Sequence, residues 1–406
     1  MSIIKDKQFY KFSAYGFLKN LRFFDPFIIL FFREMGFSFL EIGFLFSVRE
    51  ISTNIMEIPT GIIADLFGRR KSMVLSMIAY IASFTVFFFF SNFFIYIIAM
   101  FLFSVGEAFR TGTHKALILE YLRIKGMSDK KTEYYGNTRA ASQLGSAINS
   151  LLAASLVFFT GEYRLIFAFS VIPYIINLIN LYTYPIELDG ERIKIKKTES
   201  VKNFLSMFKN KSAMKYLFSA SFFSGFFKNS KNYVQPILEV FALSIPLTLI
   251  ADDQKKTSII VGIVYFFIYL LTSLASKNSA KIQQKFSEKR MAINITFIAG
   301  GIIMLLCGIF VNSGFSIIAI FMFLLLFILE NVRRPMMVSG LSDKIDHKNM
   351  ASGLSVESQL QTLTLAVIAP ITGFIADRFG VGNAIISMGI IMLLSTVITF
   401  IRKRDE

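Results

Sequence analysis

The sequence has no tryptophan, one cysteine and few charges for its length. Of its 406 residues, 17% are charged and 54% are hydrophobic, whereas soluble domains carry about 25% charged residues. A soluble protein this apolar would expose large adhesive patches, so we exclude a soluble globular class. The single Cys307 excludes an intrachain disulfide and a cysteine-based metal site. Without tryptophan, tyrosine and some phenylalanine must form any aromatic belt at a membrane surface.

The hydrophobic residues form continuous runs, and each run is long enough to cross a bilayer as a helix of about 20 residues. Strands of a membrane barrel would be shorter and would alternate in polarity. We therefore predict an all-α membrane protein with 12 transmembrane helices, at 11–33, 38–64, 72–92, 93–121, 136–160, 163–186, 213–238, 257–277, 291–311, 315–339, 351–376 and 382–401.

The formal net charge of +16 comes from basic residues in the gaps between the apolar runs. They form no basic patch on a soluble module, so we expect no nucleic-acid partner. With the N-terminus placed inside, most of these basic residues lie on the cytoplasmic side, as the positive-inside rule requires. We therefore predict that both termini are cytoplasmic. No cleavage site follows the first apolar run, which we expect to remain as a span.

The longest polar stretch divides the chain into two halves. We predict an N-terminal six-helix bundle at 1–186, a cytoplasmic linker at 187–212 and a C-terminal six-helix bundle at 213–406. The halves align with an offset of 210–223 residues. The matches are Asp25-Pro26 with Gln235-Pro236, Glu107-x-x-Arg110 with Glu330-x-x-Arg333, Ser142-Gln143-Leu144 with Ser358-Gln359-Leu360, and Phe67, Arg70 and Lys71 with Phe286, Lys289 and Arg290. Their common order indicates a duplicated six-helix unit, which is typical of one transporter design.

A glycine- and charge-rich motif follows the second run. The chain reads Gly61-Ile-Ile-Ala-Asp65-Leu-Phe-Gly68-Arg69-Arg70-Lys71. This resembles the loop signature of the major facilitator superfamily, at the position where that family carries it. The resemblance implies the two-bundle fold of the family. It also implies that the motif is a gate latch that breaks and reforms during alternating access, formed by Gly61, Asp65, Gly68, Arg69 and Arg70. The Gly373-x-x-Ala-Asp377-x-x-Gly380 string resembles an outer-loop variant of the family.

Several ionisable residues lie inside the predicted spans, where each costs roughly 2.5–3.5 kcal/mol and is usually functional. In the resembled family spans one, four, seven and ten line the cavity, and most of these residues fall there. Our candidates for substrate or proton binding are Arg22, Asp25, Glu50, Glu107, Arg110, Lys228, Glu330, Arg333 and Glu357.

The spacing of these residues leaves alternatives open. Members at i,i+3 could neutralise each other as structural pairs. Glu357 has no basic neighbour at i±3 or i±4, which favours a proton site, and Asp25 precedes a helix-bending proline. For His114 we expect a surface or helix-end role.

No catalytic triad, phosphate loop or metal cluster appears, so we predict no enzyme, no cofactor and no metal. Energy must then come from an ion gradient or from the solute's own gradient. We predict a secondary active transporter that works by alternating access: a proton-coupled antiporter for export of amphipathic small molecules. The alternatives are a transporter of a polar or anionic metabolite, a lipid translocase, and a membrane scaffold without transport. We expect a multi-pass monomer in a bacterial plasma membrane, with the solute, protons and the lipid bilayer as partners.

Overall fold

Helices are the regular elements of the computed structural model, which describes residues 5–111, 113–127, 131–189, 211–246, 252–283, 286, 288–342, 344 and 350–403. No strand occurs in these ranges. The chain separates into two compact units, and each is described by itself. The predicted linker lies mostly outside the described residues, so its position as a domain boundary stays a prediction.

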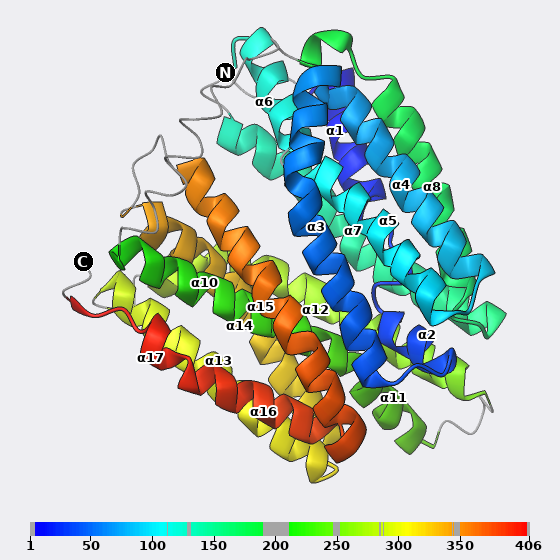
Figure 1. Ribbon diagram of the computed structural model, residues 1–406, viewed down its shortest axis with the longest axis vertical. Helices are drawn as coiled ribbons and strands as arrows, with labels where there is room; N and C mark the ends of the chain where they lie inside the picture. The colour runs from blue at the N-terminus through cyan, green and yellow to red at the C-terminus, as the bar shows by residue number, and fades with distance from the viewer. Residues whose placement is uncertain are drawn as a thin grey trace. The chain divides into compact units, whose positions relative to one another are not determined.

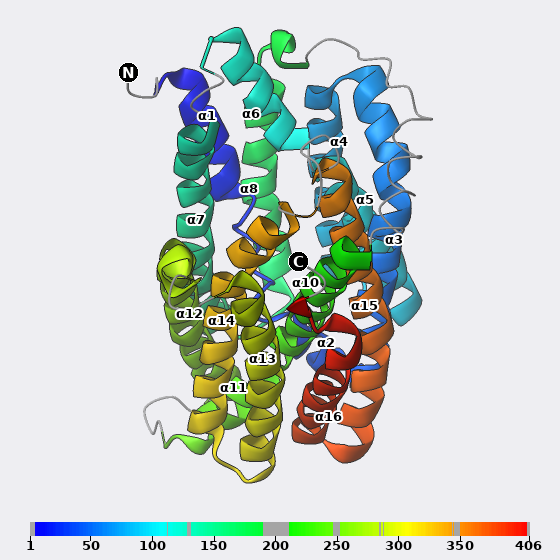
Figure 2. The same cartoon turned by 90° about the vertical axis from the view of Figure 1, so that its left-hand side faces the viewer.

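Unit 1 comprises Met1–Met35, Val48–Lys194 and Leu247–Tyr269. In it α4 lies against both α5 and α8, and α1 lies against α7 (Figures 1 and 2). Its elements are α1 (Lys7–Leu18), α2 (Ile28–Glu34), most of α3 (Phe39–Phe67), α4 (Arg69–Phe89), α5 (Phe93–Arg110), α6 (Thr113–Ile124), α7 (Lys131–Thr160), α8 (Leu165–Tyr182), the short 3-10 helix η2 (Ile186–Asp189) and the first part of α12 (Asp253–Gln283).

Unit 2 comprises Gly36–Ser47, Ile195–Pro246 and Leu270–Glu406. In it α13 packs between α14 and α16, and α10 lies against α15 (Figure 1). Its elements are the start of α3, α10 (Lys211–Ser230), η3 (Lys231–Tyr233), α11 (Val234–Ser244), the end of α12, α13 (Lys289–Asn312), α14 (Ser316–Ser342), α15 (Met350–Phe379), α16 (Val381–Leu394) and α17 (Thr396–Thr399).

Nine helices in the described part of the chain are long and apolar enough to cross a membrane. The first predicted span is instead interrupted between α1 and α2, and the seventh is interrupted by η3 between α10 and α11. Both breaks lie beside the repeated prolines Pro26 and Pro236. Proline lacks the N–H that would continue a helix, so it favours an interruption there. The total of 12 spans and the side on which the termini lie remain predictions.

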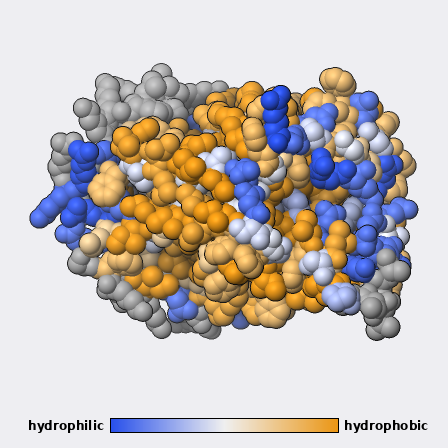
Figure 3. Space-filling model, turned by 90° about the horizontal axis from the view of Figure 1, so that it is seen from below, coloured by the Kyte–Doolittle hydropathy of each residue, from blue (hydrophilic) through white to orange (hydrophobic). Residues whose placement is uncertain are grey.

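Apolar side chains cover broad stretches of the face drawn in Figure 3. Many of the exposed side chains are large hydrophobic ones from the spanning helices, such as Phe159 at 80% and Phe94 at 73% exposed. Water does not tolerate such a surface, but lipid chains do, since they are as apolar as these side chains. The surface therefore agrees with a protein that lies in a bilayer.

Two seams of small residues hold α3 and α12. In unit 2, a Cβ atom added to Gly43 of α3 would lie 2.5 Å from the Ala369 carbonyl oxygen of α15. In unit 1, a Cβ atom on Gly262 of α12 would lie 2.3 Å from the Cβ atom of Ala154 in α7. Small residues permit such close helix packing. Gly43 and Gly262, and likewise Ala154 and Ala369, are separated by the repeat offset of 210–223 residues, which supports the predicted duplication.

Candidate functional site

The interruption of the first span exposes backbone groups that a helix would satisfy internally. Residues 19–27 leave the helical path between α1 and α2. An unpaired peptide group inside a membrane costs several kcal/mol, so neighbouring helices must supply partners. They do so in unit 1: the Asn149 side chain donates to the Arg22 carbonyl at 3.0 Å, and the Phe23 N–H donates to the Ser170 hydroxyl at 3.1 Å. The break is therefore built into the packing of α7 and α8.

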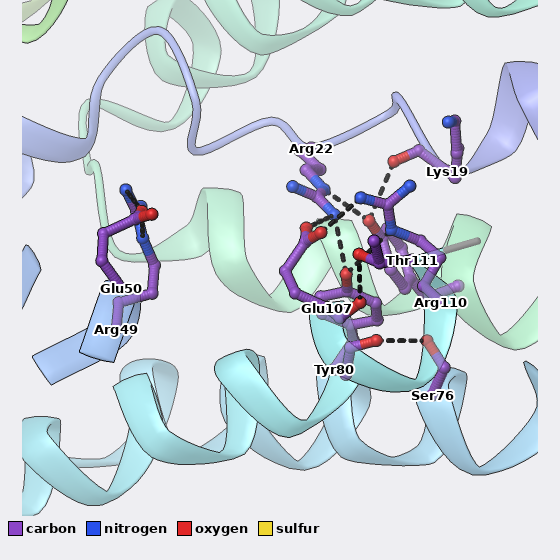
Figure 4. A network of polar contacts seen from close by, with 11 residues as sticks. Lys19, Arg22, Arg49, Glu50, Ser76, Tyr80, Glu107, Arg110 and Thr111 are labelled. Atoms are coloured by element: carbon purple, nitrogen blue, oxygen red, sulfur yellow. Dashed lines mark hydrogen bonds and ion pairs between the residues drawn. The ribbon is translucent and has the colours of Figure 1, made fainter. Parts of the chain in front are cut away.

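A partly buried charge cluster forms where this break meets the end of α5 (Figure 4). Arg22 Nη2 lies 2.6 Å from Glu107 Oε1, and Arg110 Nη2 pairs with Glu107 Oε2. The three side chains are 16%, 18% and 24% exposed for Arg22, Glu107 and Arg110. One carboxylate bridges two guanidinium groups, so the cluster carries one surplus positive charge when all three are ionised.

Two buried tyrosines hold the guanidinium groups in place. The Tyr80 hydroxyl accepts from Arg22 Nη2 at 3.1 Å and from Arg110 Nε at 3.2 Å. The Tyr174 hydroxyl accepts from Arg22 Nε at 2.7 Å and donates to the Lys19 carbonyl at 2.8 Å. Arg22 also lies over the Tyr80 and Phe103 rings, 5.1 Å from each centroid. These contacts fix the direction of the charges, as a recognition site requires.

A second pair, Arg49 and Glu50 of α3, lies apart from the cluster (Figure 4). Arg49 Nη2 is 2.9 Å from Glu50 Oε1, and the Arg49 guanidinium is 5.9 Å from the Phe103 centroid. Glu50 is buried at 8% exposure. The structure thus brings Arg22, Glu50, Glu107 and Arg110 to one region of unit 1.

The remaining candidates lie elsewhere. Asp25 is exposed on the unwound segment of unit 1. Lys228 on α10, Glu330 and Arg333 on α14 and Glu357 on α15 belong to unit 2. Among the ion pairs of the described residues, none includes Glu357, whose side chain is half-buried.

The repeated Glu330-x-x-Arg333 spacing does not produce a pair like that of Glu107 and Arg110. Arg333 is 1% exposed and donates to the hydroxyls of Ser219 at 2.6 Å and Thr296 at 2.8 Å. Glu330 accepts from the Ser224 hydroxyl at 2.8 Å. Within the described residues no ion pair joins Arg333 to a carboxylate, so the two repeats have diverged at their matched charges.

The motif after α3 is joined to the end of the first half. Gly68 has φ +97°, which favours glycine, and it starts α4. Asp189 of η2 accepts the Arg70 N–H at 2.7 Å, and Arg70 Nη1 donates to the Tyr184 carbonyl at 3.2 Å. A carboxylate at a helix N-terminus satisfies free N–H groups. The Asp65 side chain lies outside the described ones, and Gly61 faces open space.

The Gly373–Gly380 string that ends α15 makes a related contact in unit 2. Asp377 accepts the backbone N–H groups of Phe39 and Leu40 at 2.8 Å each, at the start of α3. Ser47 of α3 donates to the Ala366 carbonyl at 2.6 Å. The start of α3 is therefore fastened to α15 beside the Gly43 seam.

Sequence reasoning missed the residues that position the charges. Tyr80 and Tyr174 lie in spans three and six, outside the spans expected to line a cavity, and Asp189 is one of several acids after span six. A tyrosine in the middle of an apolar run was a usable signal, because its hydroxyl needs a partner when buried. His114 lies at the start of α6, in agreement with the expected helix-end role, and its half-buried ring stacks on Tyr15 with centroids 3.8 Å apart.

Within the described ranges, no group of three or more His, Cys, Asp or Glu side chains is placed to hold a metal ion. The candidate site consists of ionised side chains and hydroxyl groups on the unwound segment and the helices of unit 1. Such a site can bind and release a polar ligand without covalent chemistry.

Comparisons with known proteins give one consistent result. The family model described as "Major Facilitator Superfamily" matches residues 15–354. The uncharacterized MFS-type transporter YxaM of Bacillus subtilis (strain 168) is 22% identical and covers 98% of this chain and 96% of its own. The uncharacterized MFS-type transporter MJ1560 of Methanocaldococcus jannaschii is also 22% identical, and the alignment covers 94% of this chain and 93% of that relative.

Solved structures show the same fold. The nucleoside transporter NupG superposes with a TM-score of 0.77 at 11% identity, covering 98% of this chain and 100% of its own. A D-xylose-proton symporter superposes with a TM-score of 0.71 at 14% identity, covering 98% of each chain.

Proposed function

Because this chain belongs to the Major Facilitator Superfamily of membrane transporters, we propose that it carries a small polar solute across the plasma membrane by alternating access. The Arg22–Glu107–Arg110 cluster would recognise the solute. In this proposal both termini face the cytoplasm, and one chain suffices for transport.

The observation that carries the proposal is the charge cluster itself. Inserting each ionised side chain near the membrane centre costs roughly 2.5–3.5 kcal/mol, so three charges at one place are unfavourable unless they serve a function. The side chains remain 16–24% exposed, which leaves room for a ligand to reach them. Guanidinium and hydroxyl donors in a fixed arrangement suit a polar solute better than an amphipathic one.

The seams of α3 and α12 support alternating access. The boundary between the two units falls inside each of these helices, after Ser47 and after Tyr269. In this proposal, movement of one unit against the other bends α3 and α12 at these boundaries. The seams at Gly43 and Gly262 hold each part of these helices within its own unit.

Proton coupling is assigned to Glu357 rather than to Glu107. Glu107 already pairs with two guanidinium groups, so its protonation would break two ion pairs. Glu357 has a half-buried carboxyl group outside the ion pairs of the described residues, and an unpaired carboxyl group takes up a proton at less cost. We propose that a proton on Glu357 couples transport to the ion gradient.

Export of amphipathic molecules is the second candidate. A cavity of about 570 Å³ in unit 2 has an almost wholly apolar lining that includes Pro236, Phe241 and Phe315. A pocket of this size and lining suits an apolar ligand.

Uptake into proteoliposomes separates the two candidates. The panel is a nucleoside, D-xylose, a dipeptide, succinate and the amphipathic cation ethidium. We expect the wild-type protein to carry one of the polar solutes of this panel. Glu107→Gln should carry that solute at least tenfold more slowly. The matched control is Glu120→Gln on α6, where the carboxylate pairs with the exposed Arg123. Transport of ethidium alone, or polar transport that Glu107→Gln leaves unchanged, would overturn the proposal.

A further inference from the structure

A polar pocket of about 210 Å³ opens beside the charge cluster in unit 1. Its walls are α1 with the first residues of the unwound segment, the start of α6 and the first half of α7. A water molecule occupies about 30 Å³ in the liquid, so the pocket has room for a small organic molecule or a hydrated ion.

The charges on its walls have one sign. Lys19 and Arg139 line the pocket, and no Asp or Glu does. Neither cation takes part in an ion pair of the described residues. Lining charges of one sign, in low-dielectric walls, raise the local concentration of ligands of the opposite sign.

Two buried polar atoms in the pocket lack a partner. The Tyr15 hydroxyl and His114 Nε2 have no hydrogen-bond partner among the described residues, although the Tyr15 side chain is 1% exposed. Leaving a buried polar group unpaired costs about 1–3 kcal/mol, so a ligand or a water molecule that binds there would remove this cost. Both residues line the pocket, and their rings stack on each other.

The pocket is connected to the charge cluster through the backbone of Lys19. The Lys19 carbonyl accepts from the Tyr174 hydroxyl, which in turn holds Arg22. The next residue, Asn20, donates its side-chain amide to the Ser142 carbonyl of α7 at 2.5 Å. Lys19 and Tyr174 therefore connect a ligand group bound in the pocket to Arg22 of the cluster.

We propose that this pocket binds the oxyanion group of the transported solute, a carboxylate or a phosphate, through Lys19, Arg139 and the Tyr15 hydroxyl. The inference rests on the proposed function, because it makes the pocket a subsite of the same solute path. It narrows the substrate class to small molecules with an anionic head and a polar remainder that reaches Arg22 and Glu107. The cluster and the pocket together present four cations and one carboxylate.

Equilibrium binding to the purified full-length protein in nanodiscs tests the subsite, with radiolabelled succinate and radiolabelled inorganic phosphate as probes. We expect one probe to bind saturably at one site per chain, and its identity distinguishes the carboxylate from the phosphate source. Arg139→Gln and Lys19→Gln should each weaken binding at least tenfold, and Arg139→Lys should lose less. Arg123→Gln removes an equal charge from the end of α6, outside the pocket lining, and should bind as wild type does.

Tyr15→Phe distinguishes a role of the Tyr15 hydroxyl in ligand binding from a role in stability. The hydroxyl has no hydrogen-bond partner among the residues that the structure describes, so its removal should lower affinity severalfold without lowering the melting temperature of the ligand-free protein. The pocket proposal is overturned if neither probe binds, or if Arg139→Gln, Lys19→Gln and Tyr15→Phe all bind like wild type.

The two proposals fail in different ways. In one case, uptake of a neutral solute depends on Glu107, but oxyanion binding is the same without Lys19 or Arg139. This result overturns the pocket proposal and leaves the transport function in place. Arg139-dependent oxyanion binding without transport of any solute overturns the function and leaves the pocket in place.

Discussion

Removal of the bridging carboxylate should destabilise unit 1 more than removal of either charge it neutralises. Glu107→Gln keeps the side-chain volume but leaves Arg22 and Arg110 adjacent without an anion, which raises the cluster charge from one positive to two. Breaking a buried ion pair by removing one partner costs about 3–5 kcal/mol. Because these side chains are 16–24% exposed, we expect the lower end, about 3 kcal/mol.

A double-mutant cycle isolates the pairing. Arg110→Gln leaves the Arg22–Glu107 pair intact and should cost about 1.5 kcal/mol, as for a hydrogen bond to a charged group. The double variant returns the cluster to one positive charge. It should therefore be more stable than the sum of the single effects by about 0.5–3 kcal/mol, the range for residues in one network.

The assay is reversible unfolding of the purified protein in mixed detergent micelles with increasing SDS, followed by tyrosine fluorescence. This signal is free of tryptophan emission because the chain has none. Additivity of the two single effects within about 0.5 kcal/mol would refute the bridging role of Glu107.

Three further changes test separate features. Gly262→Leu should lower the melting temperature and reduce transport, since overpacking costs about 1–3 kcal/mol, whereas Gly136→Leu on α7 meets open space and should change neither. Asp189→Ala should cost about 1 kcal/mol in thermal unfolding because it leaves the Arg70 N–H at the start of α4 without its acceptor. Tyr174→Phe should lower both stability and solute affinity, since Arg22 Nε and a backbone carbonyl lose their partner; unchanged affinity would contradict the positioning role.

The sequence predicted helices well because their cause is local. Long apolar runs in lipid must satisfy their own backbone groups, which makes helices the expected element. The Glu107–Arg110 pair was also accessible, since helix geometry brings residues at i,i+3 together. The family resemblance that rested on the Gly61–Arg70 motif is confirmed by the match over residues 15–354.

The rest of the site depended on long-range packing. Arg22 meets Glu107 across 85 positions of sequence, and it does so because the break near Pro26 turns the chain away from a helical path. The identical spacing of Glu330 and Arg333 gave no pair, since hydroxyls on α10 and α13 are closer partners for Arg333. Spacing within one helix reveals which residues can meet, but the neighbouring helices decide which contacts form.

Counterflow in proteoliposomes tests the central claim most directly. Vesicles loaded with unlabelled polar solute and diluted into labelled solute should accumulate label transiently, without any ion gradient, because a single site exchanges between the two sides. Glu107→Gln should abolish this overshoot, and Glu120→Gln should retain it. Two results would contradict a transporter that recognises its solute at this cluster. One is label entry that does not depend on the internal solute, and the other is an equal overshoot in Glu107→Gln and wild type.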